Sequence, residues 1–186
     1  MGWSYSHNAT KESTIAELIR TYQSVKSDGS QTGRTIETRV HRVVGNHLWA
    51  VKDVKDDAGN VLDSFIYLAL LQKDDGCWGY KDMDESMGPH YYDCPLTLLK
   101  LCEPSNQYAR EWRERVQSFH AAKARQRAAK KACKKGATIH FKAGWSVLGS
   151  PLVSGTVVRV EGSKVWADIG RGVIRVRPRM VDRVEQ

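Results

Sequence analysis

The most apolar stretch of the chain reads Val61-Leu62-Asp63-Ser64-Phe65-Ile66-Tyr67-Leu68-Ala69-Leu70-Leu71. Aliphatic and aromatic side chains in such a short segment are typical of a buried strand. Its uninterrupted apolar run, Phe65 to Leu71, has seven residues, whereas a membrane-spanning helix needs about 20. We therefore expect residues 61–71 to form the centre of a sheet in a protein that does not cross a membrane.

Two more strands are expected before this one. Residues 35–44 and 47–54 flank Gly45-Asn46, a pair that favours a tight hairpin turn. Before them, residues 10–25 predict an amphipathic helix, because Ile15, Leu18, Ile19, Tyr22 and Val25 follow helical spacing. A helix followed by an antiparallel meander indicates an α+β fold class.

Residues 76–93 have no clear period, and we expect an irregular loop there. Pro95 suits the first turn of a short helix over residues 95–101, capped by Asp93 or Cys94. Ser105 is expected to cap a longer helix. Its expected apolar stripe consists of Tyr108, Trp112, Val116 and Phe119.

The chain changes character after residue 120. Residues 121–135 are almost entirely alanine, lysine and arginine, which predicts an exposed basic linker helix. From residue 136 the period becomes two, with strands expected at 137–141, 155–160, 164–169, 173–177 and 180–184. Five strands in about fifty residues are typical of a small SH3-like β-barrel. The expected organisation is an α+β domain over 1–120, the linker over 121–135 and the barrel over 136–186.

The net charge of +8 is unevenly distributed along the 186 residues. Residues 1–104 carry a net charge of −4, residues 105–135 carry +8 and residues 136–186 carry +4. A positive charge concentrated in one half of a chain favours a polyanionic partner. The four cysteines have irregular spacing without a C-x-x-C pair, so we expect reduced thiols and neither a zinc site nor a disulfide framework. The chain also opens without a signal-peptide pattern.

Three motifs carry a resemblance to known proteins. They are Met1-Gly2-Trp3, the segment Trp78-Gly79-Tyr80-Lys81-Asp82-Met83-Asp84-Glu85-Ser86-Met87-Gly88-Pro89, and Cys94-Pro95. Together, over residues 1–120, they look like a family of uncharacterised proteins from phages, plasmids and integrated elements. The resemblance implies a bacterial cytoplasmic location and no particular mechanism. Because small proteins of such elements often act on host defences or nucleic acid, it also implies inhibition of a host defence system.

The first candidate surface for nucleic acid is the basic segment. Helical spacing places Lys123, Arg127, Lys130 and Lys134 on one face, with Arg125, Lys131 and Lys135 beside it. Several cations on one rigid helix would displace counterions from phosphates together. The alternative is a solvated linker between two domains.

The second candidate surface is the outer face of the barrel. Alternation predicts Val158 and Val160 inside and opposite Arg159. It likewise predicts Ile174 and Val176 inside and opposite Arg175 and Arg177. With Arg171 and Arg179, these arginines would form a row suited to phosphate. Trp145 and Trp166 are either base-stacking residues or part of the core.

The third candidate is an enzyme site in the segment 78–93. The residues concerned are Asp82, Asp84, Glu85 and His90, which could ligate a divalent metal, and Cys94, which His90 could activate as a nucleophile. Their spacing matches no metal motif, and the segment lacks a Walker loop or a G-x-S-x-G elbow. We favour the alternative in which this segment packs its aromatic side chains over the sheet.

We therefore expect a cytoplasmic binding protein whose partner is nucleic acid or a nucleoprotein, with a host protein as an alternative partner. We expect no cofactor and no bound metal. A metal-dependent nuclease or nucleotide hydrolase centred on residues 78–93 and a protein–protein adaptor remain as the alternative functions. The sequence leaves the oligomeric state open.

Overall fold

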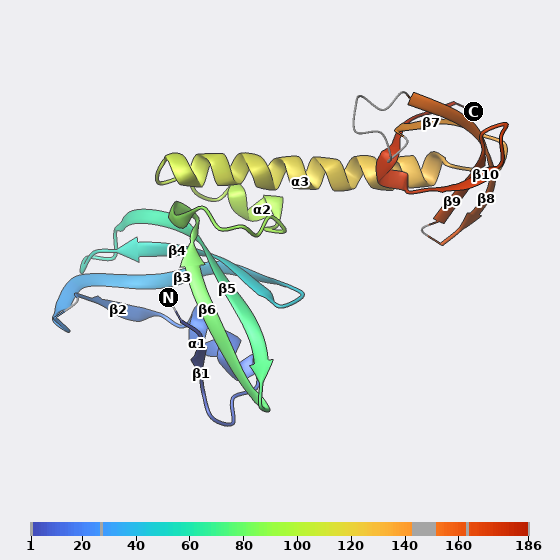
Figure 1. The fold of residues 1–186 in the computed structure, drawn as a ribbon. Coiled ribbons are helices and arrows are strands. Elements are labelled where there is room, and N and C mark those ends of the chain that lie inside the picture. The colour runs from blue at the N-terminus through green and yellow to red at the C-terminus, as the bar shows by residue number, and fades with distance from the viewer. Residues whose placement is uncertain (1, 27, 143–151, 163, 186) are drawn as a thin grey trace. The chain divides into compact units, whose positions relative to one another are not determined.

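The computed structural model describes residues 2–26, 28–142, 152–162 and 164–185. The chain divides into two compact units, Met1–Phe119 and His120–Gln186 (Figure 1). Each unit contains one antiparallel sheet, and helices accompany the sheet of the first unit. The fold class is therefore α+β, as predicted. No helix among the described residues is long and apolar enough to span a membrane.

The first unit is built on a six-stranded antiparallel sheet in the order β1-β6-β5-β4-β3-β2. The strands are β1 (Ser4–Tyr5), β2 (Tyr22–Val25), β3 (Gln31–Val44), β4 (His47–Lys55), β5 (Val61–Asp74) and β6 (Cys77–Asp84). The apolar stretch 61–71 lies in β5, which pairs with β4 and β6 in the interior of the sheet, as expected. Gly45-Asn46 forms the expected turn, since Val44 pairs with His47 on either side of it.

Helices cover both faces of this sheet (Figure 1). On one face, Trp49, Ile66 and Leu68 pack against α2 (Leu96–Leu99) and the first half of α3 (Gln107–Ala132). On the other face, Leu48 and Tyr67 pack in the same cluster as Leu18 of α1 (Lys11–Ile19). The alternation of side chains along β4 and β5 therefore supplies two separate apolar clusters.

Two expectations about the boundaries of elements were wrong. The helix expected over residues 10–25 ends at Ile19, because Arg20 is extended and Tyr22–Val25 pairs with β3 as an edge strand. The loop expected over 76–93 begins with strand β6. Asp75 and Gly76 both have positive φ and close a two-residue turn between the paired Asp74 and Cys77, a geometry that Asp-Gly pairs favour.

The helix caps and the apolar stripe of α3 also differ from expectation. Pro95 occupies the N-cap of α2 without a side-chain cap, so neither Asp93 nor Cys94 caps it. At α3, the side chain of Asn106 accepts from the amide of Ala109 at 2.8 Å, in place of the predicted Ser105 cap. The buried residues of α3 are Ala109, Trp112, Arg113 and Val116, whereas Tyr108 is 66% exposed and Phe119 is 39% exposed.

The motif around Gly79 has a structural explanation. Strand β1 pairs with β6 so that Tyr5 lies opposite Gly79. A Cβ atom at Gly79 would come within 2.4 Å of the Tyr5 ring and 2.7 Å of the Ser4 carbonyl oxygen. Glycine is therefore required at this position for the N-terminal segment to join the sheet.

The second unit contains a five-stranded antiparallel sheet in the order β10-β9-β8-β7-β11. The strands are β7 (Thr138–Lys142), β8 (Leu152–Glu161), β9 (Lys164–Asp168), β10 (Val173–Val176) and β11 (Val181–Glu185), with the short helix η2 (Pro178–Met180) before the last. Ile139, Phe141, Val157, Val165 and Val176 form its core together with Cys133 and Ala167. All five strands expected after residue 136 are present, with small differences at their ends.

Candidate nucleic-acid interface

The structure separates the carboxylates of the predicted enzyme site. Asp82 lies on β6 and accepts a hydrogen bond from the Tyr67 hydroxyl at 3.1 Å. Asp84 caps the short helix η1 (Glu85–Met87) by accepting from the amide of Ser86 at 2.8 Å. Asp82 and Asp84 are two residues apart on β6 and so share a face of the strand, but each is occupied by a protein partner. Within the described ranges, no three His, Cys, Asp or Glu side chains are close enough to hold a metal ion.

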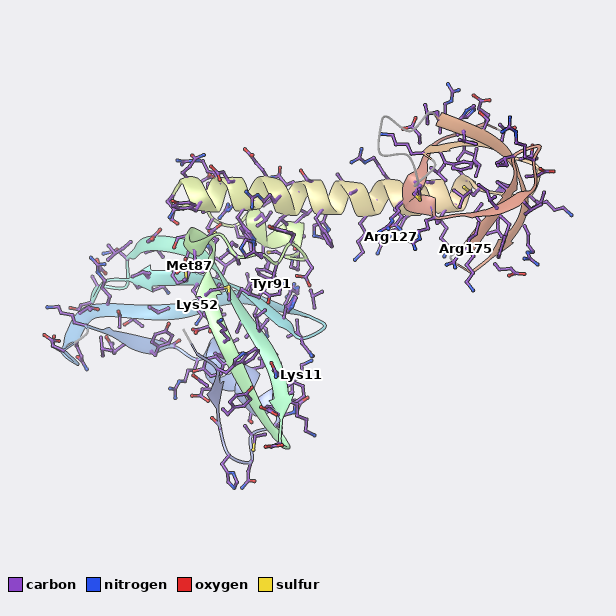
Figure 2. All side chains as sticks on the ribbon, viewed as in Figure 1. Lys11, Lys52, Met87, Tyr91, Arg127 and Arg175 are labelled. Atoms are coloured by element: carbon purple, nitrogen blue, oxygen red, sulfur yellow. The ribbon has the colours of Figure 1, made fainter. Side chains whose placement is uncertain are left out.

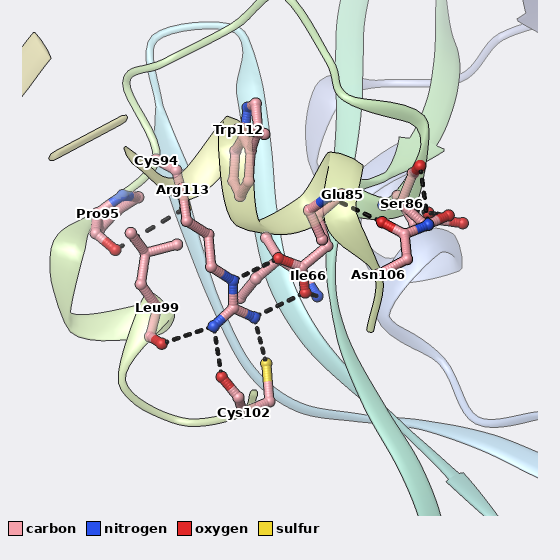
Figure 3. A network of polar contacts seen from close by, with 12 residues as sticks. Ile66, Glu85, Ser86, Cys94, Pro95, Leu99, Cys102, Asn106, Trp112 and Arg113 are labelled. Carbon is pink, nitrogen blue, oxygen red and sulfur yellow. Dashed lines mark hydrogen bonds and ion pairs between the residues drawn. The ribbon is translucent and has the colours of Figure 1, made fainter. Parts of the chain in front are cut away.

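Glu85 is buried in a polar network with Arg113 (Figure 3). Arg113 donates from Nη2 to Glu85 Oε1 at 2.7 Å and from Nε to Glu85 Oε2 at 2.5 Å. Its Nη1 donates to the carbonyl oxygens of Leu99 and Cys102 at 3.1 and 2.6 Å. Glu85 also accepts from the amide of Ile66 at 3.0 Å, which ties η1 to strand β5. The arrangement gives both charged groups hydrogen-bond partners and connects η1 to α3 and β5. Its role is therefore structural.

The remaining candidates of the enzyme site lie apart from this network. His90 is exposed at the surface. Asp93 accepts from His47 Nδ1 at 2.9 Å, and the His47 ring packs edge-on against Tyr91. Cys94 is fully buried, and burial raises the pKa of its thiol, with the charges of Glu85 and Asp93 adding to the effect. A buried thiol with a raised pKa is a poor nucleophile.

The basic segment forms the second half of α3. Residues 121–128 are exposed on every side of the helix. This stretch contains Arg125 and Arg127, and Lys130 and Lys131 follow it, still within α3. Among the residues that the structure describes, no carboxylate lies within ion-pair distance of these four cations. Figure 2 shows the Arg127 side chain extending from the helix. Lys123 also belongs to this exposed stretch.

One predicted member of the basic face is displaced. The helix ends at Ala132, and Cys133 packs into the core of the second unit. Lys134 therefore lies in the connection to β7, where its amide bonds to the carbonyl of Ala132 at 2.8 Å. The face that remains consists of Lys123, Arg127, Lys130 and Lys131, at helical spacings of three and four.

The sheet of the second unit presents a row of three side chains on neighbouring strands. Trp166 of β9 pairs directly with Arg159 of β8 on one side and with Arg175 of β10 on the other. The flanking residues Val165 and Ala167 are buried in the core, so the row lies on the outer face of the sheet. The Arg159 guanidinium carbon lies over the Trp166 ring, 4.9 Å from its centroid. This distance is typical of a cation–π contact.

A bulge in β8 determines which residues join this row. The register shifts between Val157 and Arg159, so Val157 packs into the core and Val158 falls at the bulge, where it is half-buried. Val160 pairs with the buried Val165 and therefore lies on the face opposite Arg159, as predicted, although it is 39% exposed. On β10, Val176 is buried as expected, but Ile174 is 37% exposed.

The other basic candidates of this unit are also at its surface. Arg171 and Arg177 are exposed, and no ion pair to a described residue holds either of them. Arg175 is likewise exposed (Figure 2). Arg159 has one acidic neighbour, Glu161, at 3.4 Å. The predicted stacking role of Trp145 falls outside the described residues.

The charge of the two units differs in sign. Residues 120–186 contain fifteen lysine and arginine residues and four acidic ones, a net charge of +11, whereas residues 1–119 carry a net charge of −3. Most of the cations of the second unit are exposed and lack an acidic partner within the described part of the chain. The positive potential of this unit is therefore available to a ligand.

Two polar features of the first unit were not anticipated. Arg113 is buried on α3, and Lys52 is 2% exposed on β4. The Lys52 amine lies 3.7 Å from the centroid of the Tyr67 ring and 5.1 Å from that of Tyr22. Burial lowers the pKa of Lys52 to about 8, and the nearby charge of Asp82 partly offsets this effect. Alternation along β4 could have placed Lys52 on the same face as Leu48, but its aromatic partners come from β5 and β2.

The chain matches no known protein family, and neither a curated protein nor a solved structure shows significant similarity to it.

Proposed function

We propose that the protein binds nucleic acid through its second unit. The observation that carries the proposal is the exposed cation set of residues 120–186, with a net charge of +11. Arg125, Arg127, Lys130 and Lys131 have no acidic partner among the described residues, although exposed acidic side chains occur elsewhere in the chain. A polyanion that replaces its counterions with these side chains gains binding free energy from counterion release.

The geometry of α3 supports contact with a phosphate backbone. Arg127, Lys130 and Lys131 lie on one face of a helix whose residues 121–128 are all exposed. An exposed helix made of alanine and cations has no apolar stripe to bury, so packing does not explain its composition. Phosphate contacts need only charge and reach, which this helix supplies.

The strand order supports an SH3-like barrel for residues 137–185. Four consecutive strands form a meander, and the fifth returns to pair with the first, because β11 pairs with β7. This is the order of strands in SH3-like barrels. Barrels of this kind occur in ribosomal and transcription-associated proteins, so the fold agrees with the proposed binding activity by analogy alone.

The resemblance to proteins of phages and plasmids leads us to propose an accessory role in a mobile element. In that setting, a nucleic-acid-binding protein would act on the element's own nucleic acid or on a nucleoprotein of a host defence system. The metal-dependent enzyme gains no support, because no three His, Cys, Asp or Glu side chains among the described residues lie close enough together to hold a metal ion.

The test is fluorescence anisotropy with a labelled 20-base-pair duplex at low salt. The variant carries Arg127→Gln, Lys130→Gln and Lys131→Gln together, and we expect it to bind more weakly. The matched control carries Lys26→Gln, Lys73→Gln and Lys100→Gln, which remove the same charge from exposed positions of the first unit. If the unmodified protein does not bind, or if both triple variants lose affinity equally, the proposal is wrong.

A further inference from the structure

The row formed by Arg159, Trp166 and Arg175 has a geometry that a phosphate contact alone does not require. Trp166 lies on the central strand of three, and each arginine is its direct cross-strand neighbour. Arg159 covers one face of the indole ring. Arg175 is the neighbour of Trp166 on the other side of the row, on β10.

Arg175 is exposed and makes neither an ion pair nor a ring contact with any residue that the structure describes. The Trp166 Nε1 atom is shielded and has no hydrogen-bond partner within the same described residues. The indole ring is therefore held by packing and by Arg159, and the guanidinium of Arg175 beside it remains for a ligand.

We propose that this row stacks unpaired bases, so that the second unit binds single-stranded nucleic acid in preference to a duplex. The inference rests on the proposed nucleic-acid binding and adds the class of strand. Planar indole and guanidinium groups are the usual platforms for splayed bases, and such stacking contributes about 1–3 kcal/mol per base. A duplex buries the faces of its bases and presents only their edges to a sheet.

The dimensions and the surroundings of the row fit a short single strand. Neighbouring strands of a sheet lie about 4.8 Å apart, so the three side chains span roughly 10 Å, enough for two or three bases. Arg177 lies two residues beyond Arg175 on the same face and is exposed, as is Lys164 two residues before Trp166. These two cations lie where the phosphates of a strand crossing β9 and β10 would pass.

Two acidic residues of this face have other partners. Glu161 lies 3.4 Å from the guanidinium of Arg159, and Asp168 accepts from the amide of Gly170 at 2.8 Å. Both therefore oppose the approach of phosphate less than unpaired carboxylates would. The side of the row toward Arg175 and Arg177 is the more positive one, which again places the ligand over β9 and β10.

The experiment compares three labelled ligands of equal length: a 15-nucleotide single strand, its duplex, and a 15-unit abasic strand that keeps the phosphates but lacks bases. The main variant is Trp166→Leu, which keeps an apolar side chain but removes the ring. Trp166→Phe restores a smaller ring, and Arg175→Gln removes the second platform. All binding is measured at one salt concentration, and melting temperatures report whether each variant is folded.

We expect the unmodified protein to bind the single strand at least fivefold more tightly than either the duplex or the abasic strand. Trp166→Leu should weaken single-strand binding by about 5- to 100-fold, the range of one stacked base, and leave duplex and abasic binding within twofold. Trp166→Phe should recover part of the loss, and Arg175→Gln should weaken single-strand binding more than abasic binding.

The outcomes separate this inference from the proposed function. Equal affinity for all three ligands, unchanged by Trp166→Leu, would overturn base stacking and leave phosphate binding intact. If Trp166→Leu unfolds the second unit, Arg175→Gln at the exposed end of the row decides the question. Equal losses on the base-containing and abasic strands would then overturn the inference. Absence of binding to every ligand would overturn the proposed function itself.

Discussion

Glu85 and Arg113 form a buried ion pair with two hydrogen bonds, although 28 residues separate them in the chain. Glu85 begins η1 at the end of β6, and Arg113 lies in the second turn of α3. The pair therefore connects α3 of the first unit to the end of β6 and, through Ile66, to β5. Its hydrogen bonds to Ile66, Leu99 and Cys102 use most of the remaining polar capacity of both groups.

Removal of one partner of this pair should be strongly destabilising. In Glu85→Ala the guanidinium of Arg113 stays buried without its counter-charge, which typically costs about 3–5 kcal/mol of unfolding free energy. Urea unfolding followed by circular dichroism measures this loss. Glu103→Ala is the control, because Glu103 is exposed and its replacement should change the unfolding free energy by less than about 0.5 kcal/mol.

A double-mutant cycle tests whether the pair acts as a unit. The combination of Glu85→Ala with Arg113→Met removes the unpaired charge that the single variant leaves behind. It should therefore cost less than the sum of the two single changes, by about 1–3 kcal/mol. Additive losses would show that each side chain stabilises the fold through its own contacts and that the ion pair contributes little.

The buried amine of Lys52 should make stability depend on pH. Its pKa is about 8 in the folded protein and 10.5 in an unfolded chain. Between these values the unfolded chain binds a proton that the folded protein has lost, so the unfolding free energy rises as the pH rises. The rise over this range should be about 3 kcal/mol, since each pKa unit corresponds to about 1.4 kcal/mol. Below pH 8 both states are protonated, and the penalty of burying the charge is present in full.

The measurement is urea unfolding at pH 7, 8.5 and 10 for the unmodified protein and for Lys52→Met. Tyr22, Tyr67 and Asp82 surround the amine, and together with every other titrating group they are present in both proteins, so the difference between the two profiles isolates Lys52. Lys52→Met should be the more stable protein at pH 7, and the difference should shrink toward pH 10. Parallel profiles would contradict a lowered pKa at this position.

Some of the fold could be predicted because it depends on local chemistry. Gly45-Asn46 favours a hairpin turn, and the turn lies there. Asp75-Gly76 carries an equally strong turn signal, and its omission explains why β6 was expected to be a loop. The edge strand β2 could not be separated from the preceding helix, because Tyr22 and Val25 continue the helical spacing of α1. Only pairing with β3 makes them a strand.

The same distinction between local chemistry and distant contacts applies to the functional residues. Exposed cations such as Arg127 and Arg175 are visible in composition and alternation, because exposure needs no distant partner. The buried residues of α3 follow the spacing i, i+3, i+4 and i+7 from Ala109, but the third of them is Arg113, and a search for apolar residues passes over it. The contact between Arg159 and Trp166 depends on a bulge in β8, which no local pattern indicates.

Limited proteolysis tests the division into two units. Residues 121–128 are exposed on all sides of α3 and contain Arg125 and Arg127, both of which trypsin can recognise. A helical segment without tertiary packing opens locally at low cost in free energy. The first cuts should therefore fall within residues 121–128 and leave two resistant fragments, identified by mass spectrometry. A first cut between residues 30 and 119 would contradict the division. The double variant Arg125→Gln/Arg127→Gln should be cut more slowly, which would confirm that the first cuts fall at these two arginines.

The salt dependence of binding gives the most quantitative test of the proposed interface. Arg127, Lys130 and Lys131 lie on one face of α3, whereas Arg125 projects from nearly the opposite side, two residues before Arg127. Each phosphate contact on duplex DNA contributes about 0.9 to the slope of the logarithm of affinity against the logarithm of salt concentration. The variant with Arg127→Gln, Lys130→Gln and Lys131→Gln should therefore reduce the slope by about 2–3, measured by anisotropy between 50 and 200 mM salt. Arg125→Gln should leave the slope nearly unchanged, because its side of the helix stays in solvent when the opposite face lies along the duplex. Equal reductions per residue on the two sides would show a diffuse attraction to the positive unit and would rule out a defined helical face.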